Sequence, residues 1–235
     1  MLNVVASSVR GPAHIRDDLP CQDAWLALAR SAASLAVVCD GMGSRPLARE
    51  GARAATIATR DAWRAWCRSS VGAADDLVRL LEVHWRLRLG SIDPAAAATT
   101  CLLYAEDGHG RALVAQLGDG IVARRSHDGR VHLHPSRTQA FGGLTHALGC
   151  PHSLADWSIV LDEPLRPGEA ILLATDGVSE DLEPGRIGDL ISWAVEEIGA
   201  QAHAHRLLRS ELRNWPVPRH QDDKTLLVMW NPWNP

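Results

Sequence analysis

Two aspartates stand where an apolar stretch of the sequence ends and a glycine follows. Asp40 comes after the run Leu-Ala-Val-Val-Cys, and Asp176 comes after Ala-Ile-Leu-Leu-Ala-Thr. Each run is typical of a strand that is buried on both faces, so its final carboxylate is placed at the rim of the core. A charge at such a position needs a partner, and a cation is the natural one. The glycines that follow leave room for close approach of the backbone, including ligation by a carbonyl oxygen.

Three further carboxylates occupy comparable positions. Asp23 precedes an apolar stretch, Asp119 follows one and lies between two glycines, and Asp222 stands shortly before the last apolar stretch. Several carboxylates at strand ends, with few histidines at ligand spacing, favour a hard cation such as Mg²⁺ or Mn²⁺. Asp-Gly is also the commonest tight-turn dipeptide, and a plain hairpin turn remains an alternative interpretation of Asp119.

Apolar periodicity predicts the elements that would position these side chains. The four strands between 99 and 134 are expected to form an antiparallel meander, followed by a short irregular lobe at about 135–155. Strands and helices do not alternate regularly, which favours an α+β fold with antiparallel sheets covered by helices. Strands are expected at 2–9, 24–29, 34–39, 99–105, 112–117, 121–125, 131–134, 157–161, 170–175 and 225–230, and helices at 46–68, 73–89, 186–199 and 203–213.

The composition bounds the class of protein. The 235 residues are 46% hydrophobic and 22% charged, so a single domain over 1–235 with one sizeable core is expected. The net charge of −4 gives no bulk electrostatic case for binding nucleic acid or an anionic membrane, although a local basic patch stays possible. No apolar run is long enough to span a membrane, and the first ten residues do not resemble a secretory signal. Five widely spaced cysteines predict free thiols in a reducing cytoplasm.

Five short motifs in a fixed order give these observations a common interpretation. The motifs are Gln22-Asp23, Asp40-Gly41-Met42-Gly43, Gly118-Asp119, Thr175-Asp176-Gly177 and Asp222-Asp223-Lys224-Thr225. Together they resemble the metal-dependent PPM-type protein phosphatases, the protein phosphatase 2C-like enzymes, over nearly the whole chain. In the same order they are similar to that family's [NQE]-[QE]-D, D-G-[MH]-G, G-D-S-R, [ST]-D-G and D-[ND]-x-T. Each motif is short, but five in this order, each at an expected strand edge, form a strong combined signal.

The resemblance implies a four-layer α-β-β-α sandwich with two central antiparallel sheets and a two-metal site between them. Asp40 would bridge both ions, and the carbonyl of Gly41 would bind one of them. Asp176 and Asp222 would hold the other ion.

The resemblance also implies supporting roles and a mechanism. Asp23 would act mostly through metal-bound water, and Asp119 would help to hold a third, weaker ion. Two Mg²⁺ or Mn²⁺ ions would activate a water molecule that attacks phosphorus in line. Asp223 stands where the family commonly has Asn, which is a mild change.

The sequence departs from the family pattern where substrate phosphate is gripped. The family usually carries an arginine five residues before the N-terminal aspartate, where this chain has Asp18. Arg16 is the first candidate for binding phosphate and His14 the second, and a solvated loop residue is the alternative for both. Gly120 and Ile121 replace the Ser-Arg of G-D-S-R, which puts the strand geometry beside the third ion in question.

These expectations lead to one main function and two alternatives. The main interpretation is a cytoplasmic, metal-dependent phosphatase that hydrolyses phosphoserine or phosphothreonine in proteins. It would reverse phosphorylation by a Ser/Thr kinase system. The alternatives are a small-molecule phosphomonoesterase and a non-catalytic, phosphatase-like binding or regulatory module. Loss of Asp40, Asp176 or Asp222 would favour the non-catalytic alternative, and all three are present. No nucleic-acid or membrane partner is expected.

Overall fold

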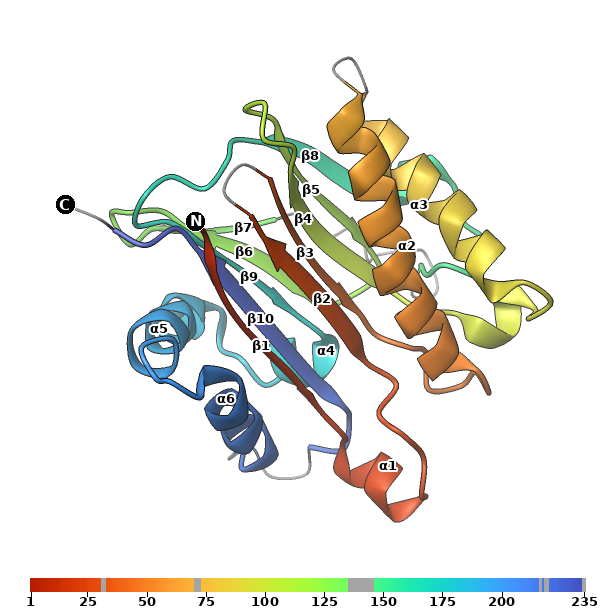
Figure 1. Ribbon diagram of the computed structural model, residues 1–235. Helices are drawn as coiled ribbons and strands as arrows, with labels where there is room; N and C mark the ends of the chain where they lie inside the picture. The colour runs from red at the N-terminus through yellow and green to blue at the C-terminus, as the bar shows by residue number, and fades with distance from the viewer. Residues whose placement is uncertain (31–32, 70–72, 135–145, 216, 218–219, 234–235) are drawn as a thin grey trace.

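The chain folds into two antiparallel five-stranded sheets that lie face to face (Figure 1). The computed structural model describes residues 1–30, 33–69, 73–134, 146–215, 217 and 220–233. One sheet has the strand order β1-β10-β9-β6-β7, and the other has the order β2-β3-β4-β5-β8. The strands are β1 (Asn3–Val9), β2 (Ala24–Ala29), β3 (Ser34–Cys39), β4 (Cys101–Glu106), β5 (Ala112–Leu117), β6 (Ile121–Arg125), β7 (Val131–Leu133), β8 (Ser158–Asp162), β9 (Ala170–Ala174) and β10 (Lys224–Trp230).

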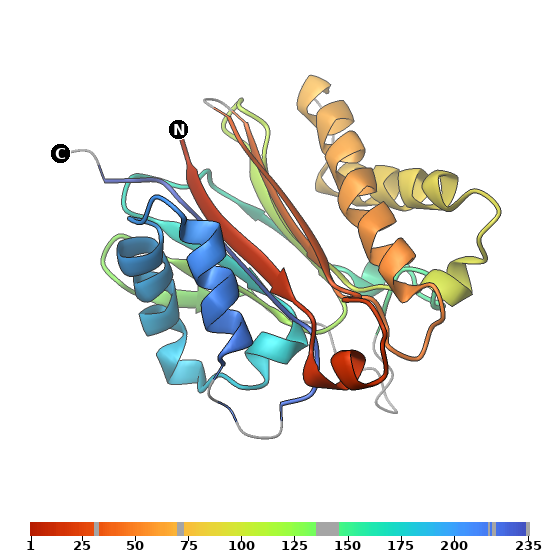
Figure 2. The same ribbon diagram turned by 60° about the horizontal axis from the view of Figure 1, so that its bottom comes forward.

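Helices cover the outer face of each sheet. Helices α2 and α3 lie on the sheet that contains β3, whereas α5 and α6 lie on the sheet that contains β10, and Figure 2 shows the same four layers from a second direction. The expected α-β-β-α sandwich is therefore confirmed. None of the described helices combines the length and the apolar character needed to cross a bilayer. The helices are α1 (Pro12–Arg16), α2 (Ala48–Arg68), α3 (Ala74–Leu89), α4 (Asp176–Ser179), α5 (Ile187–Trp193) with the π-helical turn η4 (Ala194–Ile198), and α6 (Ala204–Arg213), and the 3₁₀ turns are η1 (Pro94–Ala97), η2 (Leu154–Asp156) and η3 (Pro184–Arg186).

The four-layer arrangement explains why the central strands are apolar over most of their length. In β3, Leu35, Val37 and Cys39 pack in the core beneath α2 and α3. The alternate residues Ala36 and Val38 pack in the core between the two sheets. Because successive side chains of a strand point to opposite faces, a strand covered on both sides needs an unbroken apolar run. Such an apolar run therefore indicates a buried strand, and the polar residue at its end lies at the edge of the sandwich.

The predicted meander between 99 and 134 is wrong. Strands β4 and β5 pair with each other, but β6 pairs with β9 and β7 in the opposite sheet. The chain thus crosses from one sheet to the other between Leu117 and Ile121. A glycine-rich turn gives no indication of which sheet the next strand joins, so the sequence pattern alone does not distinguish a meander from a crossing between sheets. Of the predicted irregular lobe, residues 135–145 lie outside the described residues, and the remainder contains the 3₁₀ turn η2.

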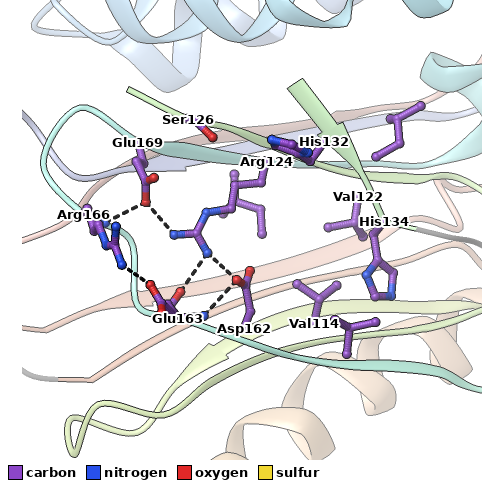
Figure 3. Close-up of a pocket in the computed structure, with 13 residues that line it drawn as sticks. Val114, Val122, Arg124, Ser126, His132, His134, Asp162, Glu163, Arg166 and Glu169 are labelled. Carbon is purple, nitrogen blue, oxygen red and sulfur yellow. Dashed lines mark hydrogen bonds and ion pairs between the residues drawn. The ribbon is translucent and has the colours of Figure 1, made fainter. Parts of the chain in front are cut away.

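Ion pairs join the two sheets at the end of the sandwich where β6 finishes. Arg124 on β6 contacts Oδ1 of Asp162 on β8 at 2.6 Å and Oε2 of Glu169 at 2.5 Å (Figure 3). The side chain of Arg124 is only 15% exposed, so both contacts are largely shielded from water. Burial opposes the ionised form of Glu169, but the hydrogen bonds from Arg124 and from the Arg166 backbone N–H, together with the charges of both arginines, outweigh burial and lower the pKa of that carboxyl. This network links the two sheets at the end of the sandwich that is remote from the predicted metal ligands, where its residues line a cavity of about 370 Å³.

Candidate metal centre

The strand ends that carry the predicted ligands meet at one end of the sandwich. Ala24 of β2 pairs with Cys39 of β3, and Ala174 of β9 pairs with both Ile121 of β6 and Leu226 of β10. Each of the five predicted aspartates lies within two residues of the first or last residue of β2, β3, β6, β9 or β10. Pairing between strands that are far apart in sequence therefore brings the aspartates together.

A cleft of about 190 Å³ lies at this end, and we call it the acidic cleft. Four of the five predicted carboxylates and Gly41 line it, and Asp23 is the predicted ligand that does not. The lining residues are Asp40, Gly41, Met42, Gly43, Ser44, Thr100, Asp119, Asp176 and Asp222.

Asp40 is fixed at the end of β3 by the two threonines that directly precede β4. Its backbone N–H donates to Oγ1 of Thr100 at 3.0 Å, and its carbonyl accepts from the Thr100 N–H and from Oγ1 of Thr99, both at 2.8 Å. The next residue, Gly41, has no room for a side chain, since a Cβ there would lie 2.6 Å from the carbonyl oxygen of Ala48. The Asp-Gly pair thus ends a buried strand with its backbone held on both sides.

Asp176 occupies the first position of the four-residue helix α4, directly after β9. Its Oδ1 is buried and has no hydrogen-bond partner among the described residues. Burial raises the pKa of Asp40 well above its ordinary value, and the charges of Asp23 and Asp176 and a hydrogen bond with Asp176 raise it further. The two carboxylates share one proton because their negative charges repel each other. A bound cation would offset this repulsion.

Asp23 lies behind the acidic cleft and is buried. Its Oδ2 accepts hydrogen bonds from Oγ1 of Thr225 at 2.7 Å and Oγ1 of Thr175 at 3.0 Å, whereas Oδ1 has no partner in the described residues. Burial raises the pKa of Asp23 to about 8, against the opposing effect of the two hydroxyls. The two threonines belong to the motifs that contain Asp176 and Asp222, but no role follows for them from the sequence alone. They orient the carboxylate so that one oxygen is left for another ligand.

Asp119 lies in the crossing between the sheets. Gly118 and Gly120 have φ angles of 98° and 90°, a conformation that favours glycine, and a Cβ at Gly120 would lie 2.5 Å from the carbonyl oxygen of Ala174. The hairpin alternative for Asp119 is wrong, because β5 and β6 do not pair. Replacement of Ser-Arg by Gly120-Ile121 also leaves the strand intact, since Ile121 begins β6 and pairs with Ala174.

Asp222 is exposed and accepts a hydrogen bond from the Asp223 backbone N–H at Oδ1, 2.8 Å away. Asp223 itself is buried and has a role that the sequence analysis missed. Its Oδ1 accepts from the Gly11 N–H and its Oδ2 from the Gln22 N–H, both at 2.6 Å. Because Gln22 precedes Asp23, Asp223 holds the N-terminal motif against the C-terminal one. The signal for this role is the D-[ND]-x-T motif, because Asp and Asn at its second position both offer a side-chain oxygen that accepts hydrogen bonds.

The two candidates for gripping phosphate lie on α1 and do not line the acidic cleft. The Arg16 guanidinium is exposed and donates to Oδ1 of Asp17 at 3.0 Å and to Oε1 of Gln221, the neighbour of Asp222, at 3.3 Å. His14 points inward, with Nδ1 2.9 Å from Oδ1 of Asp223. Their phosphate-binding roles remain predictions.

The donor set of the acidic cleft fits a hard cation. Burial raises the pKa of nearby Glu180, and the charges of Asp176, Asp119 and Asp222 raise it further, so negative charge is concentrated here. Within the described ranges, no three His, Cys, Asp or Glu side chains close on one point as a complete ligand set. A complete set of protein ligands is not required, because an ion such as Mg²⁺ is commonly bound by one or two carboxylates and keeps several water molecules. The unpartnered oxygens of Asp23 and Asp176 can contact an ion or one of its water molecules.

Comparison with known proteins agrees with this geometry. Residues 10–215 match the family model described as Protein phosphatase 2C. The fold is similar to that of the PPM Ser-Thr phosphatase MsPP from Mycobacterium smegmatis, solved in complex with cacodylate, at 22% identity, over 97% of each chain and with a TM-score of 0.64. It is also similar to the catalytic domain of the serine/threonine protein phosphatase PstP in complex with 2 manganese ions, at 21% identity, over 97% of each chain and with a TM-score of 0.63.

A third similar structure is PppA, a key regulatory component of T6SS in Pseudomonas aeruginosa, at 18% identity, over 97% of each chain and with a TM-score of 0.67. No curated protein matches the chain. The two helix-covered antiparallel sheets match the PPM phosphatase fold of these neighbours. The chain belongs to the protein phosphatase 2C family.

Proposed function

We propose that this protein is a metal-dependent phosphatase that hydrolyses phosphoserine or phosphothreonine in proteins. The carrying observation is the convergence of Asp40, Asp119, Asp176 and Asp222 on one cleft, from four separate parts of the chain. Two Mg²⁺ or Mn²⁺ ions would be held by Asp40, the Gly41 carbonyl, Asp176 and Asp222. A third, weaker ion would be held with help from Asp119.

The bound ions would act as Lewis acids toward phosphate oxygens and lower the pKa of a water molecule. The protein's own residues hold the site rigid for that chemistry. Thr99 and Thr100 fix the backbone of Asp40, and Thr175 and Thr225 fix the carboxylate of Asp23. A carboxylate whose position is set before a ligand arrives costs little reorganisation when the ligand binds.

A covalent route through cysteine has no support at this site. Cys39 directly precedes Asp40, but its side chain is fully buried between β3 and the helices that cover it. Burial raises its pKa well above the ordinary value, which disfavours the nucleophilic thiolate.

We propose that Arg16 grips the substrate phosphate and that His14, the second candidate for that role, positions α1 if Arg16 holds the phosphate. The support is the contact of Arg16 with Gln221 beside Asp222, and the inward contact of His14 with Asp223. We further propose that the protein acts in the cytoplasm on products of a Ser/Thr kinase. Its five cysteines are all free thiols, as expected in a reducing compartment.

Hydrolysis of an aryl phosphate, followed by a phosphothreonine peptide, tests the proposal. The wild type is expected to need Mn²⁺ or Mg²⁺ and to lose activity in excess chelator. Asp40→Asn and Asp176→Asn are each expected to remove nearly all hydrolysis while the circular dichroism spectrum stays unchanged. A well-folded Asp176→Asn protein that keeps more than a few per cent of the rate would exclude the two-metal assignment. Hydrolysis of the aryl phosphate but not of the peptide would favour a small-molecule phosphomonoesterase, and a wild type inactive toward both would favour the non-catalytic module.

A further inference from the structure

A second cavity, of about 710 Å³, lies beside the acidic cleft. It is formed by the end of β1, helix α1, helix α6 and the start of β10, which gather at the same end of the sandwich (Figure 1). Asp222 lines both this cavity and the acidic cleft. A ligand that reaches the proposed metal ions past Asp222 therefore has this cavity next to it.

The lining of this cavity is basic, and we call it the basic cavity. Arg10, Arg209, Arg213 and Lys224 line it, and among the described lining residues Asp222 is the single carboxylate. The whole chain carries a net charge of −4, so this local excess of positive charge is not a general property of the surface. A basic cavity at the edge of an acidic site favours a ligand that carries negative charge.

Several donors in the basic cavity lack a full set of partners. Lys224 has a side chain only 4% exposed, and Asp181, the carboxylate that the structure pairs with it, lies 3.9 Å from Nζ, beyond hydrogen-bond distance. Trp215 also lines the cavity, and its Nε1–H is buried without an acceptor among the described residues. Buried donors without acceptors are costly, so a ligand with acceptor oxygens would gain by satisfying them.

Two further cations are available on α6. Within the described ranges, the guanidinium groups of Arg209 and Arg213 form no ion pair or hydrogen bond. They are spaced four residues apart and hence lie on one face of the helix. Arginine binds carboxylate and phosphate through paired donors, so this face is suited to planar anions.

The basic cavity also has apolar walls. Val9, Pro12 and Ile15 line it from β1 and α1, and Leu212 lines it from α6. Ile15 is 54% exposed, which is high for a large aliphatic side chain in a folded protein. A peptide offers apolar stem atoms and acidic side chains together, which a free inorganic anion does not.

We propose that the basic cavity binds an acidic side chain that flanks the phosphorylated residue of a protein substrate. This proposal rests on the proposed phosphatase function, because Asp222 joins the basic cavity to the site where phosphate would react. The substrate class is then an acidic phosphopeptide, with the phosphate in the acidic cleft and a neighbouring Asp or Glu against Arg209, Arg213 and Lys224.

Two phosphothreonine peptides test this, one with Glu and one with Gln on both sides of the phosphothreonine. For the wild type, kcat/KM is expected to be roughly tenfold higher for the Glu peptide, as a few partly exposed charge pairs would give. In an Arg209→Ala/Arg213→Ala double variant, the ratio of the two kcat/KM values should fall close to one. The matched control, Arg53→Ala/Arg86→Ala, removes the same charge from exposed positions on α2 and α3 and should keep the wild-type ratio.

A binding measurement separates this proposal from the phosphatase assignment. Fluorescence anisotropy of a labelled, unphosphorylated Glu peptide, with Mn²⁺ present, should show saturable binding to the wild type and to the control. Binding should weaken by roughly tenfold in the Arg209→Ala/Arg213→Ala variant. If the wild type hydrolyses no phosphoester, the phosphatase assignment fails. The anisotropy measurement then tests by itself whether the basic cavity binds an acidic peptide. A wild-type ratio near one without saturable binding, or equal losses in both double variants, overturns the proposal.

Discussion

Asp223 and His14 contact each other across almost the whole length of the chain, with Oδ1 of the aspartate 2.9 Å from Nδ1 of the histidine. The same buried carboxylate accepts the backbone N–H groups of Gly11 and Gln22. One side chain beside β10 therefore fixes α1 and the entry to β2. Both segments lead to residues proposed to act at the acidic cleft.

Asp223→Ala would leave the N–H groups of Gly11 and Gln22 buried without acceptors. We expect the free energy of unfolding to fall by about 3 kcal/mol, as two unsatisfied buried donors would cost, in urea denaturation followed by circular dichroism. Asp223→Asn keeps an acceptor oxygen and should lose less. Asp189→Ala, which breaks an exposed ion pair with Arg186, is the control and should change stability by about 0.5 kcal/mol or less. Equal losses in Asp223→Ala and Asp189→Ala would contradict the role of Asp223.

Asp119→Ala should lower turnover and raise the Mn²⁺ or Mg²⁺ concentration needed for half-maximal rate. The reason is that a carboxylate lining the acidic cleft is lost, while Asp40, Asp176 and Asp222 remain. A metal titration at matched folded fraction measures the effect. Asp128→Ala, at an Asp-Gly turn remote from the cleft, serves as the control. An unshifted titration curve with unchanged turnover would mean that Asp119 is a structural residue of the sheet crossing.

Arg124→Ala should destabilise the fold without changing the chemistry. The substitution would leave the carboxylates of Glu169 and Asp162 without their shared cationic partner, and the side chain of Glu169 is only 9% exposed. Breaking such a shielded network by removing one partner should lower the free energy of unfolding by about 3 kcal/mol. The rate per folded molecule with an aryl phosphate should stay at the wild-type value, because the network lies at the other end of the sandwich. A fall in that rate would show that the two ends are coupled.

The pair formed by His152 and Glu82 predicts a pH-dependent stability. Nε2 of His152 lies 3.0 Å from Oε1 of Glu82, and this hydrogen bond raises the pKa of His152 and lowers that of Glu82. The stabilisation from His152 is fully present below its ordinary pKa of 6.5 and is lost as pH rises through the raised value of the folded state. The contribution of Glu82 is present above its ordinary pKa of 4.5 and is lost as pH falls through the lowered value.

His152→Gln should therefore lose more stability in mildly acidic than in alkaline solution. We expect the difference in unfolding free energy from wild type to be about 1 kcal/mol larger near pH 5.5 than near pH 8.5. Urea denaturation at both pH values measures it, and His132→Gln on exposed β7 controls for general titration. A difference that stays constant with pH would mean that the pair is not ionised in the folded protein.

Individual strands and the carboxylates at their ends could be predicted, because apolar runs and turn residues are signals that lie within a few neighbouring residues. Strands β2, β3, β5 and β6 have the bounds that apolar runs and flanking turns predicted, and Asp40 and Asp176 end such runs where the structure places the cleft. The short helix α1 was missed, since five residues are too few for a periodic pattern, although Pro12 at its first turn was a signal.

The remaining parts depend on pairing between distant segments. Nothing near residue 119 in the sequence indicates that β6 joins β9 rather than β5. Similarly, the hydrogen bonds that Thr175 and Thr225 donate to Asp23 span 152 and 202 residues. Such contacts follow from the complete topology, and the family motifs marked the residues without giving their partners.

The pairing of β1 with β10, from Asn3↔Trp230 to Val9↔Lys224, constrains when the site can form during synthesis. The strand that begins the sandwich has its neighbour at residues made more than 200 positions later, and Asp222 and Asp223 come only just before that neighbour. A growing chain on the ribosome can form the α2 and α3 layer first, but α1 and the entry to β2 stay untethered until Asp223 has emerged. Metal binding is therefore expected to begin only when nearly all of the domain has been translated. Interrupted translation products would expose the inner face of β1 and be recognised by chaperones and proteases rather than accumulate with a partly formed acidic cleft.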